Sequence, residues 1–361
     1  MRILLSFTLA CSLAACQKVP PPARVPSQQE SSAEHVVVNY GPSRLRLFPA
    51  PASEGRYVLW ASERPGLPAV FRPLGMTEQR GPTGFVPRAG ELAFVDGRIV
   101  EAPLPASPTK ALSELPLLVY DKDAKTATQQ MIPLPGPCSM RERALIQSDG
   151  KELFVAAGCA VEDKAMLLRL DAGLTVRASR SVAGAGAAEL LLHHGDADYL
   201  LIGPTVMRVP SQGEPVLGTV PQPAGDVETR ELLMAGELLL LVDGTAGRVI
   251  GMDRTSLGWK LDKRFYFEGS VQRLRAAASA SRLQIVVSER GEAQKTELVG
   301  LGLSLGSVGR DTSLPQRLIL GSGPVQSDHE LAPVSDGKSV VLLRTHGSNS
   351  GPLVAMTVLH M

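Results

Sequence analysis

Two octapeptides decide the fold of this chain: SDGKELFV at residues 148–155 and SDGKSVVL at residues 335–342. Each carries an Asp-Gly pair after its first Ser, which is typical of a tight turn, and ends as an apolar run. Short runs of this kind between turns predict β-strands. Because several runs are apolar at every position, they indicate strands buried on both faces. Similar runs recur at residues 57–61, 199–202, 238–242 and 283–287.

The spacing of these units predicts a repeat architecture. Units begin near residues 56, 90, 149, 196, 235, 281 and 336. The mean step is roughly 47 residues, and a four-stranded propeller blade occupies ~40–50. We therefore predict an all-β fold, a single β-propeller of seven blades within a range of six to eight. Two β-sandwich domains are the alternative. Strand-like segments at 35–40 and 353–359 each suit completion of the blade that begins near Ser335.

The same units resemble known propeller repeats. The two octapeptides are similar to the SPDGKxLAF signature of TolB-like propellers, although both lack its proline. Residues 56–71, RYVLWASERPGLPAVF, are similar to the strand, polar turn and strand that follow in such a repeat. Residues 249–262, VIGMDRTSLGWKLD, instead resemble the strand-turn-Trp pattern of quinoprotein-like (BamB-type) propellers. Both resemblances imply propeller architecture.

The N-terminus has the layout of an export signal. Arg2 precedes an apolar stretch too short for a transmembrane helix. The stretch ends in Leu13-Ala14-Ala15-Cys16, which resembles the bacterial lipobox and implies that Cys16 is lipidated. We therefore expect a lipoprotein signal peptide at 1–15. An ordinary signal cleaved after Ala15, or a buried Cys16, remains the alternative.

A Pro/Ser/Gln-rich linker follows the expected lipidation site. With Cys16 it spans residues 16–35, ahead of a propeller domain at 36–361. If its eighteen residues 17–34 were extended like polyproline, they would reach about 55 Å. Gln17 favours the outer membrane, with the protein facing the periplasm. Inner-membrane retention and cell-surface exposure stay open.

The cysteines of the body are Cys138 and Cys159. An exported chain with two cysteines can close one bridge in an oxidising compartment, and turn-like residues flank both positions. We expect a structural disulfide between them. Two free thiols or a metal pair remain the alternatives, although no further Cys or His ligands lie nearby in sequence.

Candidate chemical motifs are weak. Residues 302–306 match G-x-S-x-G, but poor helix-forming residues follow, so we interpret them as a glycine-rich turn. Residues 184–189 begin like a dinucleotide fingerprint and are better read as a small-residue loop. His193-His194-Gly195-Asp196-Ala197-Asp198 is rich in metal ligands, yet adjacent histidines on a strand point to opposite faces; a strand end and turn is the favoured reading. His329 and Glu330 are assigned to a loop. No catalytic, cofactor-binding or metal-binding residue is predicted.

Charge and motifs together point to a binding role. The chain has 37 Lys+Arg and 36 Asp+Glu, a net charge of +1, which argues against a nucleic-acid partner. We expect a non-catalytic binding or scaffolding propeller that is held to the bilayer through Cys16 and recognises an unidentified envelope protein or polymer. A periplasmic propeller enzyme, a hydrolase or a quinoprotein-like dehydrogenase, is the alternative. Trp60 and Trp259 are assigned to packing between blades.

Overall fold

Short strands pair with their sequence neighbours and form antiparallel sheets throughout the chain. The computed structural model describes the backbone of residues 35–39, 43–49, 56–62, 70–73, 91–105, 110–121, 128–290, 296–306, 316–323, 329–333, 339–348 and 351–360. The predicted Cys16 and linker residues 17–34 lie outside these ranges, whereas His35, assigned to the linker, begins the first described strand. No helix within them has the length and apolar character needed to cross a bilayer.

The strands form seven sheets in chain order. The first has three described strands: β2 (Ser43–Pro49), β3 (Arg56–Ser62) and β4 (Val70–Pro73). Five four-stranded sheets follow: β5 (Glu91–Val95), β6 (Arg98–Ala102), β7 (Leu112–Asp121), β8 (Thr128–Cys138); β9 (Leu145–Ser148), β10 (Leu153–Cys159), β11 (Lys164–Leu170), β12 (Val176–Ala183); β13 (Leu190–His194), β14 (Ala197–Ile202), β15 (Thr205–Pro210), β16 (Val216–Thr219); β17 (Arg230–Ala235), β18 (Leu238–Asp243), β19 (Arg248–Asp253), β20 (Trp259–Arg264); β21 (Ser270–Ala278), β22 (Arg282–Arg290), β23 (Thr296–Ser304), β24 (Gln316–Gly323).

The last sheet joins the two ends of the chain. It contains β25 (His329–Pro333), β26 (Ser339–Ser348), β27 (Gly351–His360) and, on its outer side, β1 (His35–Asn39). β1 pairs antiparallel with β27, so that His35 lies opposite Met356 and Asn39 opposite Leu353. The predicted closure of the ring by both chain ends is therefore confirmed.

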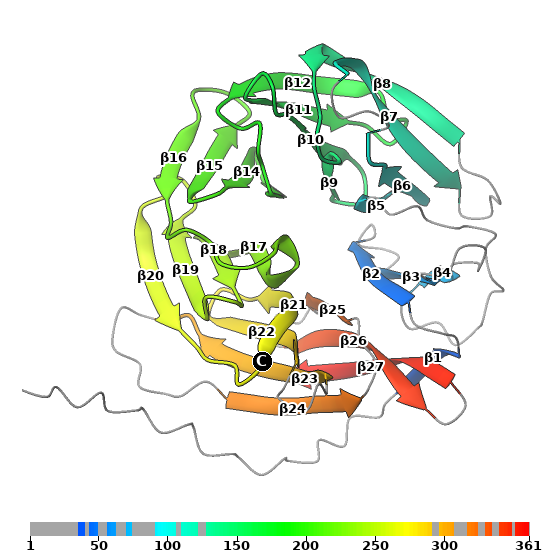
Figure 1. Ribbon diagram of the computed structural model, residues 1–361, viewed down its shortest axis with the longest axis vertical. Helices are drawn as coiled ribbons and strands as arrows, with labels where there is room; N and C mark the ends of the chain where they lie inside the picture. Colours follow the sequence, from blue (N-terminus) through cyan, green and yellow to red (C-terminus); the bar gives the residue numbers. More distant parts are fainter. Residues whose placement is uncertain are drawn as a thin grey trace, which may run out of the picture.

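The sheets stand around one axis like the blades of a propeller (Figure 1). Their first strands are innermost and contact one another in a closed circuit, in the order β2, β5, β9, β13, β17, β21, β25. These inner strands run in the same direction; for example, Val95 forms a parallel bridge with Gly150. The predicted all-β propeller is confirmed, and the described strands make seven blades.

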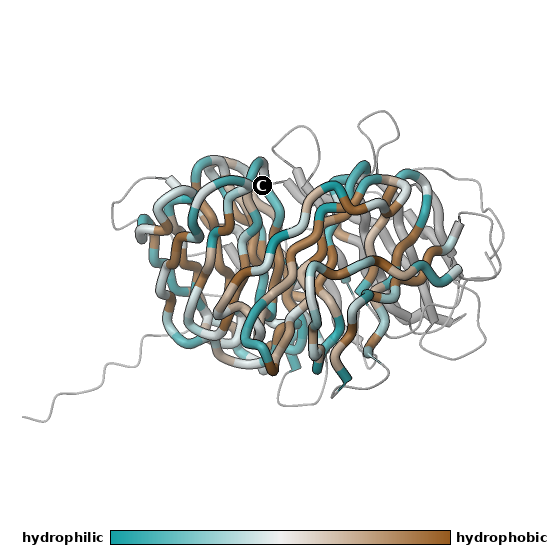
Figure 2. Tube along the Cα trace, turned by 90° about the horizontal axis from the view of Figure 1, so that it is seen from above, coloured by the Kyte–Doolittle hydropathy of each residue, from teal (hydrophilic) through white to brown (hydrophobic). Residues whose placement is uncertain are grey.

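Apolar side chains fill the spaces between neighbouring sheets. One buried cluster lies between the sheets β5–β8 and β9–β12, another between β13–β16 and β17–β20, and a third between β17–β20 and β21–β24. The second strand of a sheet contributes to the interfaces on both of its faces: β10, β18 and β22 are buried along almost their whole length. Seen from the side, hydrophobic positions concentrate within the ring, and many loops at its two faces are hydrophilic (Figure 2).

The predicted unit starts need one correction. The starts at 56, 149, 196, 235, 281 and 336 precede or coincide with the second strand of a sheet, not the first; only the start near 90 precedes a first strand. The offset arises because the units are counted from turn residues such as Asp149-Gly150, which lie between the first strand and the second. Between β5 and β6, Asp96 and Gly97 have φ values of 46° and 79°, both positive as a tight two-residue hairpin turn requires.

Candidate functional site

The ring has two faces that carry different loops. One face carries the loops between successive sheets and those between the second and third strands, and we call it the junction face. Its described loops are 103–105, 139–144, 160–163, 184–189, 203–204, 220–229, 244–247 and 265–269. The other, the hairpin face, carries the first-to-second and third-to-fourth strand loops. Its described loops are 96–97, 149–152, 171–175, 195–196, 211–215, 236–237, 254–258, 279–281 and 305–306.

Exposed apolar side chains distinguish the two faces. Among residues whose side chains are described, the large exposed hydrophobic residues in loops all lie on the junction face: Leu104, Val161, Val227 and Tyr266. The others are on outermost strands: Met131, Leu217 and Trp259. Covering an exposed apolar group with a partner lowers the free energy of the complex. The junction face is therefore the candidate binding surface.

Tyr266 is held outward by its two neighbours. Phe265 and Phe267 are buried and meet edge to face, with their ring centroids 5.2 Å apart. The Phe265 N–H donates to the carbonyl of Gly247 at 2.9 Å. Successive side chains of an extended segment alternate in direction. Burial of both phenylalanines therefore turns Tyr266 into solvent, where it is 68 % exposed.

Val227 sits in a 3-10 turn with fixed ends. The turn spans Val227–Thr229, and the Thr229 hydroxyl donates to the Asp226 carbonyl at 2.7 Å. The Asp243 carboxylate accepts from the backbone N–H groups of Ala224 and Ala246, each at 2.8 Å. The Asp243 carboxylate thus satisfies one backbone N–H in the loop that presents Val227 and one in the adjacent loop 244–247.

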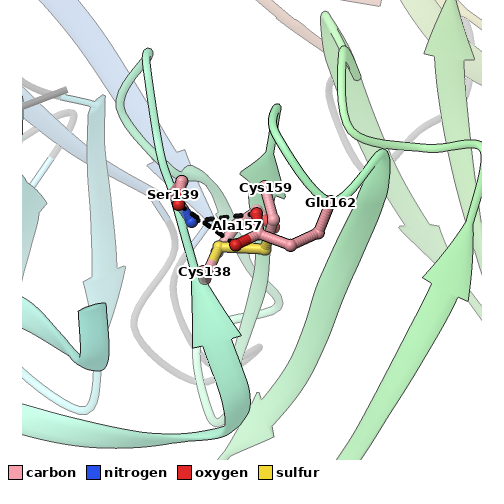
Figure 3. The surroundings of a disulfide bond; sticks show 5 residues. All are labelled: Cys138, Ser139, Ala157, Cys159 and Glu162. Atoms are coloured by element: carbon pink, nitrogen blue, oxygen red, sulfur yellow. Dashed lines mark hydrogen bonds between the residues drawn. A yellow bond between two sulfur atoms is a disulfide. The ribbon is translucent and has the colours of Figure 1, made fainter. Parts of the chain in front are cut away.

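The predicted disulfide is confirmed and supports the loop that carries Val161. Cys138 ends β8 and Cys159 ends β10, so the bond joins two neighbouring sheets (Figure 3). Their Cα atoms are 4.7 Å apart and both residues are fully buried. Beside it, the Glu162 carboxylate accepts from the Ser139 N–H at 3.1 Å and from its hydroxyl at 3.0 Å. The backbone hydrogen bond lowers the pKa of Glu162 below its ordinary value.

Ion pairs stand where the inner strands begin. Three such pairs lie near the junction face: Arg143–Glu91 at 2.9 Å, Arg230–Glu189, and Arg275–Glu228 at 3.5 Å. Arg230 is the most buried of these six side chains, with 8 % exposure, and it also donates to the Gly225 carbonyl. Each pair cancels its own charge, so these groups create no strong field of one sign.

The histidine-rich stretch forms a contact between blades. His193 Nδ1 lies 2.8 Å from Asp198 Oδ1 across the β13–β14 hairpin. The imidazole stacks on Phe154 of the preceding sheet, with ring centroids 3.4 Å apart. His194 is exposed at the end of β13, in agreement with the interpretation of this stretch as a strand end followed by a turn. Within the described ranges no three His, Cys, Asp or Glu residues form a group that could hold a metal ion.

Other candidate motifs also have structural positions. Gly302 and Ser304 lie inside β23, so the interpretation of this segment as a turn is wrong for its first half. Gly184 to Glu189 connect β12 and β13 as a loop, as predicted. Trp259 is 48 % exposed, and its Nε1–H donates to Thr219 of the neighbouring sheet at 2.7 Å.

His329 corrects another expectation. It begins β25 and is completely buried, and its Nε2 lies 3.0 Å from the Val286 carbonyl oxygen. Its assignment to a solvated loop is wrong, because an inner strand begins at this position.

The exposed residues of the junction face were not predicted from the sequence. The segment Phe265-Tyr266-Phe267 carried a usable signal, since three consecutive aromatic residues in an extended segment must place at least one on each side. Leu104, Val161 and Val227 carry no such local signal. Their exposure depends on which loops the ring gathers at one face.

Comparison with known proteins supports the fold alone. No protein-family description matches the sequence, and no curated protein matches it. Among solved structures, Kluyveromyces lactis Hsv2 is similar with a TM-score of 0.52 and 9 % identity, over 88 % of this chain and 98 % of that one. Kluyvelomyces marxianus Hsv2 has a TM-score of 0.52 and 7 % identity, over 88 % and 99 %. The AfRom2 CNH domain has a TM-score of 0.51 and 8 % identity, over 91 % and 99 %.

Proposed function

We propose that this protein is a membrane-anchored lipoprotein whose propeller binds an envelope protein through its junction face. The observation that carries the binding role is the placement of Leu104, Val161, Val227 and Tyr266 in loops of that face. Loops on a rigid scaffold are frequent binding elements, and exposed aromatic residues are frequent anchors of protein interfaces.

The anchor part of the proposal rests on the N-terminal sequence. Leu13-Ala14-Ala15-Cys16 supports lipidation of Cys16, and Gln17 supports an outer-membrane location with the body in the periplasm. Two or more acyl chains on Cys16 hold a protein stably in a bilayer, because each buried methylene contributes about 0.8 kcal/mol. The disulfide between Cys138 and Cys159 is in keeping with an oxidising compartment.

Neutral ion pairing on the junction face supports a protein partner over a nucleic acid. Three acidic groups at that face, Glu91, Glu189 and Glu228, each pair with an arginine. A nucleic-acid surface would instead present an excess of Lys and Arg toward phosphates. Exposed aromatic residues such as Tyr266 are enriched at protein interfaces.

Cross-linking in living bacterial cells, followed by affinity purification and mass spectrometry, tests the proposal. The wild-type chain should capture a specific envelope protein, and Cys16→Ala should reduce or abolish that capture. The double variant Val227→Ser/Tyr266→Ser should lose the cross-link, whereas Leu217→Ser should retain it. Leu217 is a matched control because it is 62 % exposed but lies on the outer strand β16.

The outcomes separate the two parts of the proposal. Equal capture by wild-type protein and Val227→Ser/Tyr266→Ser would exclude the junction face as the binding surface. Failure of the wild-type chain to incorporate labelled fatty acid at Cys16 would exclude the anchor. Capture of a glycan or other polymer, with no protein above background, would change the class of partner.

A further inference from the structure

The direction of β1 determines where the linker meets the ring. Met356 lies later in β27 than Leu353, and β27 runs from the junction face to the hairpin face as the third strand of its sheet. His35 pairs with Met356 and Asn39 with Leu353. The chain therefore enters β1 at the hairpin face and runs toward the junction face.

The entry point is also at the outside of the ring. The last sheet has the order β1-β27-β26-β25, with β25 innermost and β1 outermost. The linker thus reaches the propeller at the outer rim of the hairpin face. The N-terminal end of β1 therefore lies away from both the axis and the junction face.

The length of the linker makes this entry point decisive for orientation. Its eighteen residues would have a root-mean-square span of about 24 Å if flexible, and about 55 Å if fully extended as polyproline. Strands such as β14 and β22, of 6 and 9 residues, rise about 20–30 Å between the two faces. To turn the junction face toward the bilayer, most of the linker would have to run along the outside of the ring.

We infer that the anchored propeller holds its hairpin face toward the bilayer and presents its junction face to the aqueous space beyond it. This inference rests on the proposed anchor at Cys16. The partner bound by Val227 and Tyr266 is then a protein surface exposed to the aqueous compartment, not a membrane-embedded segment beneath the ring. The hairpin face suits proximity to hydrated lipid headgroups: among described side chains, its loops expose no large apolar residue that would insert.

Fluorescence quenching on vesicles measures this orientation. The full lipidated chain is prepared as Glu237→Cys and as Tyr266→Cys, and each free thiol is labelled with the same fluorophore. Both positions flank strands of one sheet, Glu237 before β18 on the hairpin face and Tyr266 after β20 on the junction face. Both side chains are well exposed. The proteins are reconstituted into vesicles containing headgroup-quencher lipids.

We expect stronger quenching at position 237 than at position 266. Deleting residues 20–26 from the linker should increase the difference, because a shorter linker leaves less length to run around the rim. Equal quenching at the two positions, or stronger quenching at 266, would overturn the orientation while leaving the anchor intact. Vesicle flotation is measured on the same samples, with Cys16→Ala as the unanchored control. If the wild-type Cys16 chain fails to float, the anchor itself is wrong and the orientation falls with it.

Discussion

Ser139 and Glu162 fasten two neighbouring blades through a double hydrogen bond. The backbone N–H of Ser139 donates to Glu162 Oε2 at 3.1 Å, and its hydroxyl donates to Oε1 at 3.0 Å. Ser139 directly follows β8, and Glu162 lies in the loop between β10 and β11. The contact closes beside the disulfide (Figure 3), so the segment that exposes Val161 is held by a covalent and a charge-assisted bond together.

The Ser139–Glu162 contact should give stability a specific acid dependence. The Ser139 backbone N–H holds the pKa of folded Glu162 below its ordinary value of 4.5. The ionised group therefore stabilises the fold above that value, and this contribution is lost as the pH falls through the lowered folded-state pKa. We expect Glu162→Gln to reduce the urea midpoint at neutral pH, with the difference from wild type shrinking in acid. Glu142→Gln, at an exposed position in the neighbouring loop, is the control. A deficit that is independent of pH would contradict the prediction.

Loss of the disulfide should destabilise the whole ring. Cys138 and Cys159 are 21 residues apart, and the chain-entropy account gives about 3 kcal/mol for a loop of this size. We expect Cys138→Ala/Cys159→Ala to lower the free energy of unfolding by about this amount in urea titrations. Because both sulfurs are buried, the native protein should resist reductant until it unfolds. Wild-type protein unfolded with reductant separates loss of the bond from the truncation of two side chains; an unchanged midpoint would refute the prediction.

Gly186 should be intolerant of even one methyl group. A Cβ at this position would lie 2.8 Å from the Cys159 carbonyl oxygen and 2.9 Å from the Asp163 Cα, both backbone atoms that cannot rotate away. Overpacking of this kind costs about 1–3 kcal/mol, so Gly186→Ala should lower the thermal midpoint clearly. Gly306→Ala is the matched control, because its nearest neighbour would be the Ser304 Oγ at 3.5 Å, an ordinary contact. Equal effects of the two substitutions would show that close approach is not the cause.

Arg230 and Glu189 should behave as an energetic unit. The Arg230 side chain is 8 % exposed, so removing its partner by Glu189→Gln leaves a largely buried charge less well compensated. Because Glu189 itself is about one-third exposed, we expect a loss of about 1–3 kcal/mol, below that of a fully buried pair. Arg230→Met alone should also destabilise, since Glu189 then loses its cation. A double-mutant cycle should return a coupling energy of about 1 kcal/mol or more between the two side chains. Strictly additive losses of stability would show that they are not coupled.

The propeller was predictable because its second strands carry a strong signal. Leu153 to Ala156 and Leu239 to Val242 are buried on both faces, so each reads as an unbroken apolar run after a turn. First strands give a weaker signal because polar residues interrupt the apolar run: His193 and His194 end such a strand. This difference explains why the predicted units start one strand late.

The burial or exposure of a residue could not be predicted from the sequence where it depends on contacts between blades. The disulfide could be predicted because only two cysteines follow residue 16. Burial of His329 could not, since its partner Val286 lies on a strand of another sheet. The exposed residues of the junction face pose the same difficulty: Leu104 and Tyr266 come from distant loops that only closure of the ring places on one face.

Pairing of β1 with β27 also has a consequence for the time course of folding. His35 and Met356 lie near opposite ends of a 361-residue chain, and contacts between such distant segments form slowly because loop closure must precede them. β1 is synthesised early and β27 late, so β1 has no partner until β27 has been made. Until then β27 presents an open edge, on which a chaperone or a second unfinished chain can pair. Completion of this sheet is therefore the slowest and most aggregation-sensitive step that we expect in the maturation of the protein.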